Sequence, residues 1–134
     1  MHPLYQKAHA LSHKVIGATI GAHRDKGTGL IESIYERCLM HELSLRNIPA
    51  TNQQLVPVRY KDLVFEEKLR LDIIADECLL VENKAVEAIL PVHKAQLLSY
   101  MKLMDIPLGL IINFHELILK HGIVRLFLPD ADRA

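Results

Sequence analysis

Apolar side chains recur every three or four positions in the first third of the chain. Over residues 4–23 this spacing places them on one helix face, which predicts a first helix. The two glycines in DKGTG, residues 25–29, can take positive φ and end that helix. Helical spacing resumes at Leu30 and lasts until Asn47 and Pro49, which predicts a second helix.

The pattern then changes from helical spacing to strands. Residues 53–60 predict a strand, and Pro57 within it indicates an edge position or a bulge because proline cannot donate to a ladder. Residues 64–86 predict two strands joined by a tight turn at ADEC, residues 75–78. The apolar residues of these two strands are nearly continuous, which is typical of central strands covered on both faces.

The last third of the chain predicts a helix over residues 92–105, a strand over residues 108–114 and a final hairpin over residues 117–128 that turns at His121 and Gly122. The side chains expected to be buried on this helix are Ala95, Leu98, Met101 and either Leu103 or Met104. With no internal repeat or linker, the simplest architecture is one layered α/β domain over residues 1–134, in which helices flank a mixed central β-sheet.

Composition narrows the possible functions. Sixteen basic residues balance sixteen acidic ones, so nucleic acid would have to be recognised locally rather than by a global positive field. Cys38 and Cys78 form no CxxC pair and lie in apolar segments, which indicates reduced thiols. No apolar run approaches the length of a membrane span. We therefore expect a cytoplasmic protein with no membrane partner, and its high aliphatic content at small size predicts a homodimer.

Three charges stand at strand positions within LRLDIIADECLLVENKAV. Glu82 and Lys84 are two residues apart and so project from one face of a strand. A three-residue turn would place Asp72 opposite Glu82 and Arg70 opposite Lys84, whereas a two-residue turn would place Asp72 opposite Val81. The charge pattern favours the first register, because it gathers the charges on one face and leaves the other for Leu71, Ile73, Leu79 and Val81.

Two carboxylates within about 5 Å of each other repel unless a cation or a proton lies between them. A divalent metal would satisfy them, and oxygen-only ligands select Mg²⁺ or Mn²⁺. Lys84 would then lie near a phosphate oxygen, as metal-assisted phosphodiester hydrolysis requires. From spacing alone, an ordinary salt-bridge cluster on a half-exposed hairpin face remains the alternative.

Two more polar pairs occur at helical spacing. Glu32 and Tyr35 are three apart, and Gln96 and Tyr100 are four apart. Each pair also has a structural explanation. The helix macrodipole favours an acidic residue in a first turn, and an amphipathic helix has a polar outer face.

The block GLIESIY, residues 29–35, resembles the signature of the GxxExxY proteins. Four later blocks follow in that family's order: LDIIADECLLVENKAV, HKAQLLSYMKL, GLIINF and HGIVRLFL. The resemblance covers residues 15–128. GxxExxY proteins are a small branch of the PD-(D/E)XK nuclease superfamily, so the resemblance implies a restriction-endonuclease-like core, a mixed sheet flanked by helices.

The resemblance also implies roles for particular residues. The chain matches the motif's Asp, its second acidic residue and its lysine at Asp72, Glu82 and Lys84. The acidic residue of the preceding helix and the polar pair of the following helix are matched by Glu32, Gln96 and Tyr100. There are two departures: Leu71 stands where the motif has proline, and Asn83 takes a middle position that is often apolar.

Two functions follow as hypotheses. The first is a Mg²⁺- or Mn²⁺-dependent nuclease acting on DNA or RNA, with Asp72, Glu82 and Glu32 as metal ligands and Lys84, Gln96 and Tyr100 completing the catalytic set. The alternative is a non-catalytic nuclease-fold module that binds protein or nucleic acid, which the neutral net charge and an aromatic content of 5% favour.

Overall fold

Two helices, three strands, a third helix and two further strands follow one another along the chain. The computed structural model describes residues 1–133. Its elements are α1 (Tyr5–Lys26), α2 (Glu32–Leu45), β1 (Ala50–Tyr60), β2 (Leu63–Ala75), β3 (Leu79–Lys84), α3 (Pro91–Met104), β4 (Leu108–Asn113), the 3₁₀ turn η1 (Leu119–Gly122) and β5 (Ile123–Phe127).

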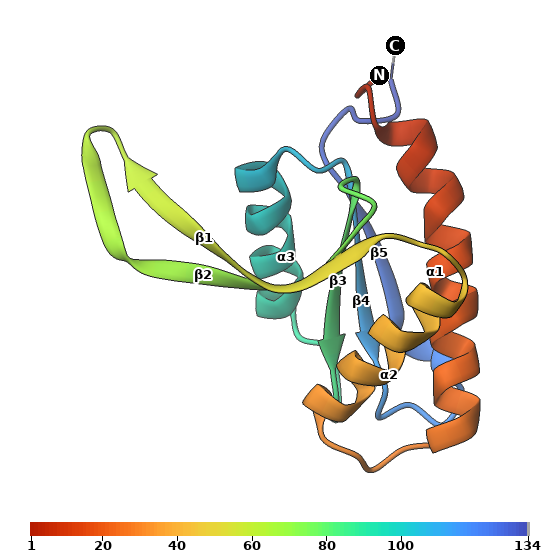
Figure 1. Cartoon of the computed structure of the whole chain (residues 1–134). Coiled ribbons are helices and arrows are strands. Elements are labelled where there is room, and N and C mark those ends of the chain that lie inside the picture. The colour runs from red at the N-terminus through yellow and green to blue at the C-terminus, as the bar shows by residue number, and fades with distance from the viewer. Residues whose placement is uncertain (134) are drawn as a thin grey trace.

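The five strands form one sheet in the order β1-β2-β3-β4-β5. β3 and β4 run parallel, and the other neighbours are antiparallel. Helices α1 and α2 cover one face of the sheet and α3 covers the other (Figure 1). The expected fold class, a mixed sheet flanked by helices, is confirmed.

The sheet separates two hydrophobic cores. Val81 on β3 packs into the core under α1 and α2, while its neighbour Leu80 packs under α3 beside Leu97 and Met101. This alternation follows from the pleat of a strand, which sends successive side chains to opposite faces. The prediction of a strand covered on both faces is therefore confirmed for β3.

Tyr35 fixes the loop between α1 and α2. Its hydroxyl donates to the carbonyl oxygen of Gly27 at 2.6 Å and accepts the backbone N–H of Leu30 at 3.1 Å. Its ring is buried and stacks on Phe114 with 4.3 Å between centroids. Gly27 has φ 67, as expected for the glycine that ends α1. Tyr35 therefore has a structural role and sets where α2 begins.

Strands β1 and β2 extend beyond the rest of the sheet as a two-stranded ribbon, here called the arm and defined as residues 55–70 (Figure 1). Pro57 lies in this edge strand, and the register shifts between Pro57 and Arg59, as its position predicted. The expected burial of β2 is wrong for its first part, because residues 63–68 are exposed. β2 pairs with β3 only from Ile73 onward, so within residues 1–133 no third strand pairs with the arm.

The buried face of α3 differs from the expected one. Met101 is buried as expected, but Leu97 replaces Ala95 as the second buried residue, while Leu98 and Met104 are half-buried and Ala95 and Leu103 are exposed. Gly109 on β4 explains this orientation. A Cβ at that position would lie 2.7 Å from the sulfur of Met101 and 3.0 Å from a methyl of Leu97, so the glycine admits both side chains.

The predicted final hairpin over residues 117–128 is wrong. Its first half forms η1 rather than a strand, and β5 pairs antiparallel with β4. Gly122 packs closely at this point, since a Cβ there would lie 2.6 Å from the carbonyl oxygen of Asn113. The chain returns to β4 because that strand offers a free edge beside a buried core.

Cys38 is half-buried and Cys78 is buried, and both are free thiols. Burial raises the pKa of the Cys78 thiol, which makes it a poor nucleophile. Across residues 1–133, each helix is too short or too polar to serve as a bilayer span.

Candidate active site

Asp72 and Glu82 lie where β2 and β3 separate. The two strands pair at Ala75 with Leu79, Ile74 with Leu80 and Ile73 with Val81, which confirms the three-residue turn. The next position along is not a ladder pair. There, Oδ2 of Asp72 accepts the backbone N–H of Asn83 at 2.9 Å, so the carboxylate takes the place of a strand carbonyl.

The expected pairing of Arg70 with Lys84 is wrong. Arg70 pairs with Leu55 in the arm and is exposed. Leu71 also departs from expectation, because it packs in the α3 core rather than on the face of Ile73. Both differences have one cause: β2 leaves β3 at Asp72 and from there follows β1 alone.

Burial dominates the electrostatics of the carboxyl pair. Glu82 is only 7% exposed, and burial followed by the charge of Asp72 raises its pKa to about 8. Burial also raises the pKa of Asp72, although its bond from Asn83 and the charge of Lys84 oppose the rise. Near neutral pH Glu82 therefore keeps its proton. Two carboxylates this close repel each other, so the pair needs a proton or a cation between them.

Lys84 lies near both carboxyl groups without a direct ion pair to either. Its charge lowers the pKa of Asp72 and of Glu82. Within residues 1–133, no oxygen of Asp72 or Glu82 comes within 4.0 Å of its ammonium. The salt-bridge alternative is therefore not the observed arrangement, and the ammonium lies beside the carboxyl pair at the end of β3.

Glu32 comes to the same end of β3 from the first residue of α2. Its Oε1 accepts the backbone N–H of Ala85 at 3.1 Å, directly after Lys84. Its charge also raises the pKa of Asp72, so the two carboxyl groups are neighbours. Nevertheless, no three His, Cys, Asp or Glu side chains in the described part of the chain are placed to hold an ion together.

The donor chemistry of this end fits a hard divalent cation in part. Asp72 and Glu82 supply oxygen donors that already require a positive partner. Glu32 uses Oε1 for its bond to Ala85, so its Oε2 is the donor for an ion. Asp72 and Glu82, two of the three expected ligands, are thus adjacent, and the third, Glu32, is bonded to the backbone at the end of β3.

Gln96 and Tyr100 lie on α3, which covers the face of the sheet opposite to α2 and the face to which Leu80 and Glu82 point. Nε2 of Gln96 donates to the Tyr100 hydroxyl at 2.9 Å, as their i, i+4 spacing predicted. Burial raises the pKa of Tyr100, and the charges of Glu82 and Asp72 raise it further. The structure therefore brings this pair into the electrostatic field of the carboxyl groups.

Glu36 is a site neighbour that the sequence did not reveal. It is 7% exposed, and its carboxylate accepts bonds from Asn52 at 3.2 Å and Gln53 at 2.7 Å. Burial raises its pKa, and the charges of Asp72 and Glu32 add to the rise. Its position four residues after Glu32 was the available signal, because that spacing shares a helix face.

Two buried asparagines stand next to the site. Asn113, the β4 partner of Lys84, accepts the N–H groups of Val86 and His115 and donates to the carbonyl of Val86 at 2.8 Å. It thereby holds the loop that follows Lys84. Asn83 is equally buried, but neither polar atom of its side chain has a hydrogen-bond partner in residues 1–133.

With this geometry in place, the sequence was compared with known protein families. Residues 9–126 match the model of the PD-(D/E)XK nuclease superfamily. The chain belongs to that superfamily. The match runs from α1 to β5 and includes the whole PD-(D/E)XK motif region from Asp72 to Lys84. Neither the curated proteins nor the solved structures gave a match.

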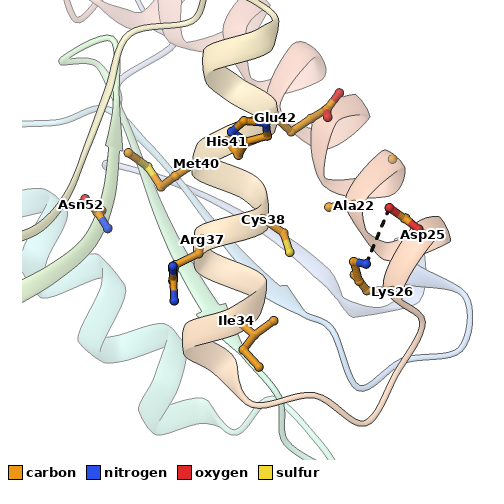
Figure 2. A pocket seen from close by; sticks show the side chains of 11 residues that line it. Ala22, Asp25, Lys26, Ile34, Arg37, Cys38, Met40, His41, Glu42 and Asn52 are labelled. Atoms are coloured by element: carbon orange, nitrogen blue, oxygen red, sulfur yellow. Dashed lines mark ion pairs between the residues drawn. The ribbon is translucent and has the colours of Figure 1, made fainter.

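A cavity of about 790 Å³ lies apart from the PD-(D/E)XK residues. Its lining comes from α1 and α2, with Asn52 of β1 at one side (Figure 2). Figure 2 also shows the Asp25–Lys26 ion pair of 3.9 Å on α1. Asn52 links this cavity to the site, because its side chain donates a hydrogen bond to Glu36. We assign the chemistry to the carboxyl pair and not to this cavity.

Proposed function

We propose that this protein is a metal-dependent nuclease of the GxxExxY branch, a hydrolase acting on phosphodiester bonds of DNA or RNA. The observation that carries the proposal is the buried carboxyl pair, Asp72 and Glu82, beside the ammonium of Lys84 in a PD-(D/E)XK chain. PD-(D/E)XK nucleases generally use divalent metals. A pair that keeps a proton at neutral pH is a pair that a cation would relieve.

In this proposal Asp72, Glu82 and Glu32 hold Mg²⁺ or Mn²⁺. When bound, such an ion polarises a phosphoryl oxygen and makes water a better nucleophile. Lys84 stabilises the charge that develops on the phosphate and orients the attacking water, because its ammonium has no ion-pair partner in the pair itself. The Tyr100 hydroxyl, positioned by Gln96, hydrogen-bonds the substrate phosphate from the α3 side.

The test is a panel of single- and double-stranded DNA and RNA incubated with Mn²⁺. Wild-type protein is expected to cut at least one substrate, and Glu82→Gln is expected to cut none. Glu77→Gln is the matched control, because Glu77 is an exposed glutamate in the β2–β3 turn. Equal cleavage by wild type and Glu82→Gln would reject the site, and cleavage by neither would reject nuclease activity on this panel.

The second candidate is a non-catalytic nuclease-fold module that binds protein or nucleic acid. The balanced charge of the chain favours it, because it gives no general attraction for a nucleic-acid substrate. Calorimetric titration with Mn²⁺ separates the candidates. The nuclease requires binding that Asp72→Asn abolishes, whereas the module requires none.

We also propose that residues 1–134 form one domain that acts in the cytoplasm as a homodimer. The two free cysteines support a reducing compartment. Thiol titration of the denatured, unreduced protein should find two thiols per chain, and light scattering should return twice 15.2 kDa. A titration near zero would contradict the compartment, and a mass of one chain would contradict the dimer.

A further inference from the structure

The arm leaves one edge of β2 without a neighbour. β1 pairs with one edge from Ala75 to Leu63, but β3 pairs with the other edge only at residues 73–75. From Leu63 to Arg70 the second edge pairs with no strand within residues 1–133. Proline, one protection of an edge, occurs in β1 and not here, and the charged residues of this edge, Glu66, Glu67, Lys68 and Arg70, are of both signs. An exposed edge of this length is a template for another strand.

The arm also exposes apolar side chains that an isolated ribbon cannot bury. Leu63 is 56% exposed, and Phe65 is 39% exposed. One concave face is lined by Val58, Phe65, Glu67 and Leu69, with Glu67 between the two apolar side chains of β2. Two-stranded ribbons are marginal in water, whereas three or more strands with an apolar face are stable. The arm therefore lacks a strand, and its free edge is the place for it.

We infer that the missing strand is β2 of a second copy of this chain, paired antiparallel across the free edge and centred on Glu67. The two arms then form a four-stranded sheet, β1-β2-β2-β1, with one two-fold axis. The segment LVFEEKLRL, residues 63–71, is self-complementary in this register. Phe65 faces Leu69 of the second copy on the apolar side, and Glu66 faces Lys68 of the second copy on the polar side.

Symmetry makes each of these contacts occur twice. Two Glu66–Lys68 pairs and two Phe65–Leu69 pairs stabilise the register, since opposite charges and apolar groups directly across a strand pair attract. Shifting the centre by one residue to Glu66 replaces them with Phe65 against Glu67 and Val64 against Lys68. The self-complementary charges favour a second copy over an unrelated peptide. The one unfavourable contact is Glu67 against itself.

The inference rests on the proposed homodimer and not on the proposed catalysis, so it is tested without metal or substrate. Sedimentation equilibrium in EDTA at tens of micromolar is expected to find dimers of wild type. Lys68→Glu and Glu66→Lys should each weaken the dimer on the order of tenfold or more, because each turns two attractive pairs into repulsive ones. The double variant Glu66→Lys with Lys68→Glu should restore wild-type affinity.

Two further variants locate the centre and the interface. Glu67→Gln is expected to tighten the dimer severalfold, because it removes the like-charge contact at the axis. Lys61→Glu makes the same charge change as Lys68→Glu at the exposed arm tip and should leave the dimer unchanged. Circular dichroism checks that each variant is folded. Monomeric wild type, or a double variant that is no tighter than the single ones, would overturn the inference.

Discussion

Glu82→Gln tests the electrostatics of the carboxyl pair through the pH dependence of stability. Glu82 has its pKa raised from 4.5 to about 8 by burial and by Asp72. Below pH 4.5 both the folded and the unfolded chain hold this proton. Between pH 4.5 and 8 only the folded chain holds it, so the free energy of unfolding falls as pH rises. Above pH 8 the loss is complete.

The magnitude follows from the size of the shift. Each unit of pKa difference corresponds to about 1.4 kcal/mol, so wild type should lose roughly 3 kcal/mol from this group between pH 5 and pH 7. Glutamine cannot titrate. The unfolding free energy of Glu82→Gln should therefore decline less steeply, and the variant should gain on wild type as pH rises.

Urea denaturation followed by circular dichroism, at pH steps from 5 to 8.5 with EDTA present, measures these curves. Glu77→Gln, at an exposed glutamate, should run parallel to wild type. Parallel curves for wild type and Glu82→Gln would refute the reasoning, because they would mean that Glu82 ionises alike in the folded and unfolded chain. With Mn²⁺ added, wild type should gain most at the alkaline end, where the metal displaces no proton.

Three further predictions concern neighbouring residues. Asp72→Asn should abolish Mn²⁺ binding in calorimetry, whereas Lys84→Met should keep or tighten that binding and lose cleavage. Equal loss of Mn²⁺ binding in both variants would contradict the assigned roles. Tyr35→Phe should lower the free energy of unfolding by about 1–3 kcal/mol, because the hydroxyl makes two hydrogen bonds in the α1–α2 loop. In the same urea titration, Tyr60→Phe in the exposed arm should change this free energy little. Asn83→Leu should raise the free energy of unfolding by about 1–3 kcal/mol, because the polar atoms of Asn83 lack hydrogen-bond partners within residues 1–133. Asn113→Leu should lower it by about 2 kcal/mol or more, because Asn113 makes three hydrogen bonds. A destabilised Asn83→Leu would show that the side chain of Asn83 is hydrogen-bonded.

The register of the site could be predicted because it is set locally. The sequence allowed a two-residue or a three-residue turn, and the charge pattern around Asp72 and Glu82 favoured the three-residue turn, which places Ile73 opposite Val81. The separation of the strands one residue later could not be predicted. There β2 keeps β1 on one edge, while β3 leaves its other edge and continues beside β4, and the local pattern of β2 does not mark that point.

The same distinction applies to the residues around the site. Glu32, Gln96 and Tyr100 were implied by the family resemblance; Glu32 bonds to the end of β3, and the charges of the carboxyl pair reach Tyr100. Glu36 shares a helix face with Glu32, but its bonds could not be predicted, because its partners Asn52 and Gln53 lie on a strand and depend on how α2 packs against β1. Long-range packing of this kind leaves no periodic trace in a sequence.

The separation of β2 from β3 has a mechanical consequence. Asp72 belongs to the strand that continues into the arm, while Glu82 belongs to the buried centre of the sheet. A change in the direction of the arm relative to β3 would therefore change the distance between the carboxyl groups of Asp72 and Glu82.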